Sequence, residues 1–325
     1  MSSQRLREPT LITQRDGVRA DGYLDASLVG GHSRTLAQPS VVERARGVGE
    51  DWSMSGLGYD RAESARLERA YTTADVQAQR DAVRRALETR PGEAILDLGS
   101  GPGILACELA AEVGATGKVT AVDVSAEMNA IAARRVAEAG FGERIEVVLG
   151  DAAALAFPDT CFDAAVSTQV LEYVEDVHRA LRELRRVLRP GGRLVVLDTD
   201  WDTLVWSARD ESLAARISDG WSGHAPHTRL PRVLAKQLRA SGFQVTEVFS
   251  LTLLNTTYDE SVYSHNLAGL IAHFLRSNKA LSEDELEAWQ ADLASLDKDG
   301  EYFFSLNRYC FRAIATLEPN PALVE

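Results

Sequence analysis

The sequence is poor in the features that mark secreted and membrane-spanning proteins. It has three cysteines in 325 residues, Cys107, Cys161 and Cys310, and no C-x-x-C pair. A disulfide framework and a zinc knuckle are therefore disfavoured, and a reducing, cytoplasmic compartment is expected. No apolar run approaches the roughly 18 residues that span a bilayer. We also find no apolar signal segment near the N-terminus, so no membrane partner is expected.

Basic residues are scarce as well. The chain has 48 acidic against 35 basic residues, which gives a formal charge of −13. An acidic surface repels phosphate backbones, so a nucleic-acid partner is not expected. The remaining composition, 45% hydrophobic and 26% charged, is that of a globular protein that buries its own core.

The hydrophobic pattern divides the chain near residue 70. Residues 1–70 have few periodic apolar positions and predict a partly irregular arm, a candidate contact for a homodimer. In residues 71–325, short apolar strands alternate with helical periods, which predicts an α/β fold with a mostly parallel sheet. The predicted strands cover residues 94–98, 119–122, 145–149, 162–167, 194–197, 243–251 and 302–315.

Amphipathic periods between these strands predict the helices. The first helix carries Val76 and Leu87 on one face and is stopped by Pro91-Gly92. Two helices, at about 259–277 and 283–296, form an insertion over residues 255–298 that we expect to act as a lid. Ser282 and Glu285 have the spacing of a capping box for the second of them. The other predicted helices run from the glycine-rich turn through residue 113, and over 126–139, 177–188 and 230–238.

The most informative segment is the glycine-rich turn at residues 97–103, Asp-Leu-Gly-Ser-Gly-Pro-Gly, which follows a predicted strand and opens a helix. Glycine lets the backbone approach a ligand, and the helix N-terminus offers free N–H groups. Asp123 ends the next strand, where a carboxylate can accept both hydroxyls of a ribose. Asp151 and Gln169 follow the third and fourth strands. The carboxyl ends of parallel strands bind ligands in such sheets, so these residues predict one nucleoside site.

The spacing of the turn argues against two other cofactors. A dinucleotide turn has G-x-G-x-x-G, but here Ile104 stands at the third glycine position. The leading Asp97 would face the negative pyrophosphate, whereas it suits a ligand that carries an ammonium and a sulfonium. A P-loop is excluded because no Gly-Lys-Ser/Thr follows.

Residues 95–103, Asp123, Asp151 and the run 181–192 resemble the class I S-adenosylmethionine-dependent methyltransferases, especially those of quinone and natural-product biosynthesis. The resemblance implies a Rossmann-like, doubly wound sheet of seven strands with an antiparallel last strand, and S-adenosyl-L-methionine as cofactor. The residues implied or proposed at the cofactor are Tyr71, Arg80, Asp97, Gly99, Ser100, Gly101, Asp123, Val124, Met128, Asp151, Ala152 and Gln169. Among them, the Gly99–Gly101 turn backs the methionine part, Ala152 flanks adenine, Met128 stacks on it, and Gln169 lies near the sulfonium.

Residues for the methyl acceptor are less sharply indicated. Tyr71 and Arg80 either contact the methionine carboxylate or belong to an ordinary helix start. The insertion either covers the acceptor or packs on the sheet edge with its polar residues outside. From these segments and the end of the fifth strand we predict Asp200 and His265 as catalytic candidates, and Trp201, Tyr263 and Asn266 as pocket residues.

Two further segments carry candidate polar groups. The D-x-D-x-D run that starts at Asp198 has Thr203 and Arg209 where an EF-hand needs glycine and glutamate, so no metal is expected. His224 and His227 lie in a predicted Gly/Pro loop and are candidate bases or solvated side chains.

The sequence thus predicts methyl transfer to nitrogen or oxygen of a small-molecule metabolite by in-line displacement, in secondary metabolism. Two alternatives stay open. One is methylation of a macromolecule, tRNA or protein, which the absence of a basic face disfavours. The other is a non-methylating relative that only binds the cofactor.

Overall fold

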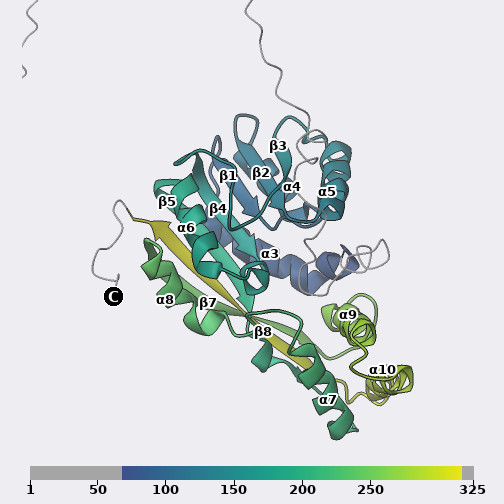
Figure 1. Ribbon diagram of the computed structural model, residues 1–325. Coiled ribbons are helices and arrows are strands. Elements are labelled where there is room, and N and C mark those ends of the chain that lie inside the picture. Colours follow the sequence, from purple (N-terminus) through teal and green to yellow (C-terminus); the bar gives the residue numbers. More distant parts are fainter. Residues whose placement is uncertain (1–67, 317–325) are drawn as a thin grey trace, which may run out of the picture. The chain divides into compact units, whose positions relative to one another are not determined.

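The computed structural model describes residues 68–316, in which one mixed sheet of eight strands carries all the other elements (Figure 1). Its strand order is β3-β2-β1-β4-β5-β8-β6, and β7 pairs with β8. The strands are β1 (Ala94–Leu98), β2 (Lys118–Asp123), β3 (Ile145–Leu149), β4 (Phe162–Thr168), β5 (Leu188–Thr199), β6 (Val205–Trp206), β7 (Phe243–Asn255) and β8 (Phe304–Ala315).

The predicted α/β class and the reversed last strand are confirmed. Strands β1 to β5 pair in parallel, and β8 runs antiparallel between β5 and β7. Seven of the eight strands occupy predicted positions. The eighth, β6, is a two-residue strand that pairs with the start of β8, and it is too short to give an alternating pattern.

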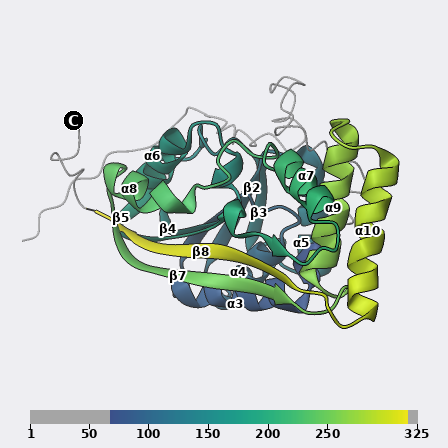
Figure 2. The same ribbon diagram turned by 90° about the horizontal axis from the view of Figure 1, so that it is seen from below.

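Helices cover both faces of the sheet (Figure 2). On one face Leu109 of α4 and Val136 of α5 pack with Val83 of α3 in one buried cluster, and on the other Leu184 of α6 packs with Leu234 of α8. The first predicted helix ends at Leu87, before Pro91-Gly92, because the backbone of Glu88 is left-handed. These helices are α3 (Ala74–Leu87), α4 (Ile104–Val113), α5 (Ala126–Glu138), α6 (Val177–Val187) and α8 (Pro231–Ala240).

The predicted insertion between β7 and β8 forms two helices, α9 (Tyr263–Ser277) and α10 (Glu283–Lys298). The capping box of Ser282 and Glu285 is present at the start of α10. Both helices share a buried cluster with α7 (Glu211–Trp221), which sequence reasoning missed. Only Ile217 and Trp221 of α7 are buried, so its apolar periodicity is weak.

Two expectations from the sequence concern the chain ends and membranes. The predicted arm at residues 1–70 and its dimer contact fall almost wholly outside the described residues. Within residues 68–316, no helix has the length and apolar character needed to cross a membrane.

Two glycines allow a test of how tightly α4 and α5 pack. Gly103 (φ +76°) precedes α4, and a Cβ there would lie 2.9 Å from the Cβ of Ala132 on α5. Gly140 (φ +72°) has no heavy atom within 4 Å of such a Cβ. Both alanine substitutions strain a left-handed backbone, at a cost of about 1–2 kcal/mol. We expect Gly103→Ala to lower the free energy of unfolding by roughly 1–3 kcal/mol more than Gly140→Ala, measured by urea denaturation. Equal losses would show that the two helices separate without cost.

Candidate functional site

The glycine-rich turn after β1 is fixed to the neighbouring strand β2. The N–H groups of Gly99 and Ser100 both donate to the carbonyl of Val122, at 2.7 and 3.0 Å. Gly99 has φ +70°, and a Cβ there would lie 2.0 Å from a methyl carbon of Val170. Only glycine fits between β2 and the segment that follows β4, so the turn is held close against both.

Asp123, at the end of β2, fastens this turn to the start of α5. One carboxylate oxygen accepts from the N–H of Gly101 at 2.8 Å, and the other accepts from the N–H of Ser125 at 2.8 Å. Burial raises the pKa of Asp123, while the N–H groups of Ser125, Gly101 and Val124 act in the opposite direction. From the sequence we expected Asp123 to bind a ribose but did not expect it to hold the turn. No sequence motif indicates hydrogen bonds such as those to Gly101 and Ser125.

Asp97, the last but one residue of β1, is a buried carboxylate without a complete set of partners. It is 1% exposed, and its Oδ2 has no hydrogen-bond donor among residues 68–316. Burial, with the negative charges of Asp123 and Glu108, raises the pKa of Asp97 to about 7. The buried hydroxyl of Ser100 also lacks a partner within the described part of the chain. This carboxylate and hydroxyl suit a cationic, hydrogen-bonding ligand.

A cleft with about 440 Å³ of empty space, part of it open to solvent, lies beside the turn. Six residues expected at the cofactor line it, namely Tyr71, Arg80, Gly99, Ser100, Gly101 and Gln169. The other lining residues are Val76, Gln79, Pro102, Ile104, Leu105 and Thr168.

The remaining residues expected at the cofactor follow β2 and β3. Met128 and Ala152 are buried, 5% and 8% exposed, and the N–H of Met128 donates to the hydroxyl of Ser125 at 3.2 Å. Asp151 accepts from the N–H of Ala153 at 2.8 Å, which closes the turn after β3. These residues therefore lie at neighbouring strand ends, as a nucleoside extending across the sheet edge requires.

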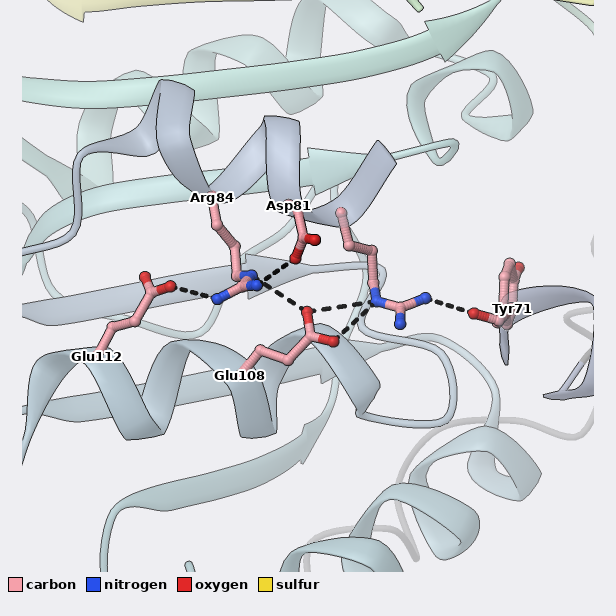
Figure 3. A network of polar contacts seen from close by, with 6 residues as sticks. Tyr71, Asp81, Arg84, Glu108 and Glu112 are labelled. Atoms are coloured by element: carbon pink, nitrogen blue, oxygen red, sulfur yellow. Dashed lines mark hydrogen bonds and ion pairs between the residues drawn. The ribbon is translucent and has the colours of Figure 1, made fainter. Parts of the chain in front are cut away.

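Arg80 joins a network of ion pairs that ties α3 to α4, in which Figure 3 labels Arg84, Glu108 and Glu112. Its Nε donates to Glu108 at 3.1 Å, and its Nη1 donates to the carbonyl of Tyr71. Arg84 extends the network to Glu108 and to Glu112. Arg80 thus lines the cleft while it also holds the backbone at Tyr71. The sequence offered no direct signal for Glu108, which pairs across two helices.

Gln169 has an unusual backbone for a residue other than glycine, with φ +56°. Its N–H donates to the carbonyl of Leu197 at 2.6 Å, and its side chain donates to the hydroxyl of Thr199 at 3.3 Å. A side-chain hydrogen bond also links Gln169 to Tyr263. Gln169 therefore connects the cleft to the first residue of α9.

The residues expected at the acceptor have different surroundings. Tyr263 reaches the cleft through Gln169, whereas the side-chain amide of Asn266 donates to the carbonyls of Glu260 and Val262 and holds the turn before α9. The indole N–H of Trp201 donates to Glu172 at 3.3 Å.

Asp200 and His265, the two catalytic candidates, lie on different elements and have different partners. Asp200 follows β5 and forms an ion pair with Arg232 at 2.7 Å. His265 lies on α9, with its ring 4.8 Å from the ring of Tyr258. Neither is among the residues that line the cleft.

The predicted Gly/Pro loop with two histidines begins inside α7, which ends at Trp221. His224 is fully buried and stacks on the ring of Trp221 at 3.9 Å. Burial lowers the pKa of His224 to about 4, so its ring is neutral at physiological pH. Across residues 68–316 no group of three or more His, Cys, Asp or Glu is placed to hold a metal ion.

Sequence reasoning also missed a group of buried polar side chains next to the cleft. Glu172 and Arg308 are 0% exposed, and Gln79 is 5% exposed. A signal existed for Arg308, because it lies between Leu306 and Cys310 in the alternation of the predicted last strand. That position is buried, and a charged residue there is unusual.

Residues 96–196 match the family model described as a methyltransferase domain. The chain is 32% identical over 276 residues to an uncharacterized 37.1 kDa protein in transposon TN4556 of Streptomyces fradiae, over 81% of this chain and 75% of that protein. It is 42% identical over 109 residues to the ubiquinone/menaquinone biosynthesis C-methyltransferase UbiE of Hahella chejuensis, over 34% of this chain and 44% of that protein.

A solved structure has a similar fold. The Haemonchus contortus N-methyltransferase 2, in complex with phosphomonomethylethanolamine and S-adenosylhomocysteine, matches with a TM-score of 0.54. The match covers 82% of this chain and 61% of that chain at 16% identity, so it concerns the fold alone.

The burial of Asp97 gives a prediction for pH dependence. Its pKa of about 7 in the folded protein exceeds the value of 3.8 for an ordinary aspartate, so the stability that comes from burying the protonated acid is lost as the pH rises from 4 through 7. Asp97→Asn has no proton to lose there. We expect the difference in unfolding free energy between Asp97→Asn and the wild type to grow by up to about 4 kcal/mol between pH 4 and pH 8. Urea denaturation of the ligand-free proteins at each pH measures it. A difference that does not change with pH would contradict the burial of an ionisable Asp97.

Proposed function

The chain belongs to the class I S-adenosylmethionine-dependent methyltransferases, and from that premise we propose that it methylates a nitrogen or oxygen atom of a small metabolite. The observation that carries the proposal is the buried, incompletely paired carboxylate of Asp97 beside the glycine-rich turn and the cleft. A small, compact acceptor suits an acidic chain, because an acidic surface repels the phosphate backbone of nucleic acids. We place the reaction in secondary metabolism and in the cytoplasm, to which the three unpaired cysteines are suited.

We assign the cofactor contacts from the strand ends. Asp97 pairs with the ammonium of the methionine part, and the Gly99–Gly101 turn backs it. Asp123 accepts from the ribose hydroxyls. Adenine lies between Met128, with Val124, and Ala152, and Asp151 meets its amine. When bound, S-adenosylmethionine supplies an electrophilic methyl group on sulfur.

We propose that the chain aligns the acceptor in line with that methyl group and excludes water. Tyr71 and Gln169 border the cleft at the methyl end. The helices α9 and α10 act as the lid, and Tyr263 at the start of α9 forms part of the acceptor wall with Trp201 and Asn266. His265 and Asp200 are the candidate bases for an acceptor that must lose a proton.

UbiE is named a C-methyltransferase; the chain spans 44% of the Hahella chejuensis protein and 71% of the Escherichia coli protein. That name is said of UbiE, and nitrogen or oxygen as the acceptor atom is our proposal for this chain.

A labelling experiment tests the reaction. Purified protein is incubated with methyl-labelled S-adenosylmethionine and a cell extract, which is then separated into small organic compounds and polymers. Label in small compounds supports the proposal, and label in protein or RNA supports a macromolecular acceptor instead. If the cofactor binds but no label moves, the chain uses it without methyl transfer.

Removal of the Asp123 carboxylate tests the cofactor assignment. Asp123→Ala loses charge-assisted hydrogen bonds worth about 1.5–3 kcal/mol. We expect its affinity for S-adenosylhomocysteine, measured by calorimetry, to fall by roughly 10- to 150-fold. Asp159→Ala is the control, because it removes the same charge from an acid whose side chain is 73% exposed. Equal affinities of both variants and the wild type would contradict the assignment.

A second pair of variants tests the base. We expect His265→Ala to lower label transfer to the acceptor while its affinity for S-adenosylhomocysteine is unchanged, since the imidazole acts on the acceptor. His273→Ala, on the same helix, should transfer label like the wild type. Unaltered transfer by His265→Ala removes His265 from the candidates.

A further inference from the structure

Arg308 is a fully buried cation on β8, the strand next to the edge strands β6 and β7. It lies on β8, opposite Thr199 of β5 and Leu251 of β7, and its exposed fraction is 0%. Its Nη1 donates to the side-chain carbonyl of Gln79, but Nε and Nη2 have no hydrogen-bond partner among residues 68–316. Because guanidinium stays ionised in proteins, these are charged donors left without an acceptor.

The surroundings of Arg308 compensate its charge only in part. Its guanidinium lies 4.6 Å from the centre of the Tyr263 ring. The carboxyl groups of Glu172 and Asp198 are close enough to interact with it through space, but within the described residues neither forms an ion pair with it. Burial raises the pKa of Glu172 to about 7, and burial together with Glu172 raises the pKa of Asp198. Burial therefore favours the neutral form of both acids, which limits how far they compensate the charge of Arg308.

A single side chain, that of Gln79, connects Arg308 to the cleft. Gln79, which accepts its hydrogen bond, lines the cleft. Tyr263, which lies against its guanidinium, hydrogen-bonds with Gln169, and Gln169 lines the cleft as well. Gln79 therefore stands between Arg308 and the cleft, and its displacement would open the guanidinium to a ligand there.

We propose that Arg308, with Tyr263 beside it, forms an acceptor subsite that binds an anionic oxygen, a carboxylate or a phenolate. This rests on the proposed function, because it places the acceptor at the cofactor cleft. A planar anion can accept from Nε and Nη2 together, the paired geometry for which guanidinium is suited. Binding would supply the acceptor that these buried donors lack, and Arg308 would select acidic over neutral and cationic acceptors.

Simple aromatic probes test the charge preference. The full-length protein is saturated with S-adenosylhomocysteine, and the dissociation constants of benzoate, benzamide and benzylamine are measured by calorimetry. We expect benzoate to bind at least tenfold more tightly than benzamide, and benzylamine to bind most weakly. Equal binding of acid and amide, binding of none of the three, or a preference for benzylamine would overturn the inference.

Three variants assign the preference to Arg308. In Gln79→Glu the new carboxylate already contacts Arg308, so the preference for benzoate should disappear in a folded protein. Arg308→Gln should lose it too. Arg312→Gln is the matched control, because Arg312 lies on the same strand and pairs with Glu88. It should keep the tenfold preference.

The same variants can also contradict the role of Arg308. Retention of the preference in Gln79→Glu, or its loss in Arg312→Gln, would overturn the role of Arg308. If the wild type fails to bind S-adenosylhomocysteine, the proposed function fails at that step. Normal binding of S-adenosylhomocysteine without a preference for benzoate removes only the acceptor subsite.

Discussion

Around the cleft beside the glycine-rich turn, the main physical constraint is the free-energy cost of burying ionisable groups that lack a full set of hydrogen-bond partners. Asp97, Glu172 and Arg308 are each at most 1% exposed, and each has a polar atom with no hydrogen-bond partner in the described part of the chain. Such groups lose their hydration and gain only partial compensation. They remain buried because the apolar clusters on both faces of the sheet stabilise the fold around them. An acid thus lies beside the glycine-rich turn and a cation lies behind Gln79, both next to residues that line the cleft.

The parallel strands explain why these groups lie together. Asp97, Asp123 and Gln169 come from or directly follow different strands, and parallel pairing brings those strand ends to one edge of the sheet. This part was predictable from the sequence, since each strand is a short apolar run followed by a polar or glycine residue. Contacts between distant segments were not predictable in the same way. The pair of Arg80 with Glu108 and the bond of Asp123 to Gly101 depend on side-chain directions that no spacing reports.

In the insertion before β8, too, the helices could be predicted from the sequence, but the contacts of their side chains could not. The two insertion helices were predicted from their periodicity and the Ser282–Glu285 capping box. The surroundings of individual residues on them differ from what their polarity suggested. Asn266 holds a turn and Tyr263 lies beneath a guanidinium, because burial on α9 is decided by packing with α7 and β8. Arg308 shows that a charged residue at an apolar position of an alternating strand can indicate a functional site, because arginine is seldom fully buried without a specific partner.

A final connection joins the insertion to the cofactor end. Asp75, in the first turn of α3, accepts from the side chain of Asn255 at 3.0 Å and from the N–H of Tyr263 at 3.3 Å. The same helix carries Gln79, which contacts Arg308, and Arg80, which holds the carbonyl of Tyr71. Helix α3 therefore contacts the start of α9, Arg308 and the backbone at Tyr71 from within about two turns. A displacement of α3 would change the contacts at all three places, so one helix, rather than separate loops, links the insertion to the cleft.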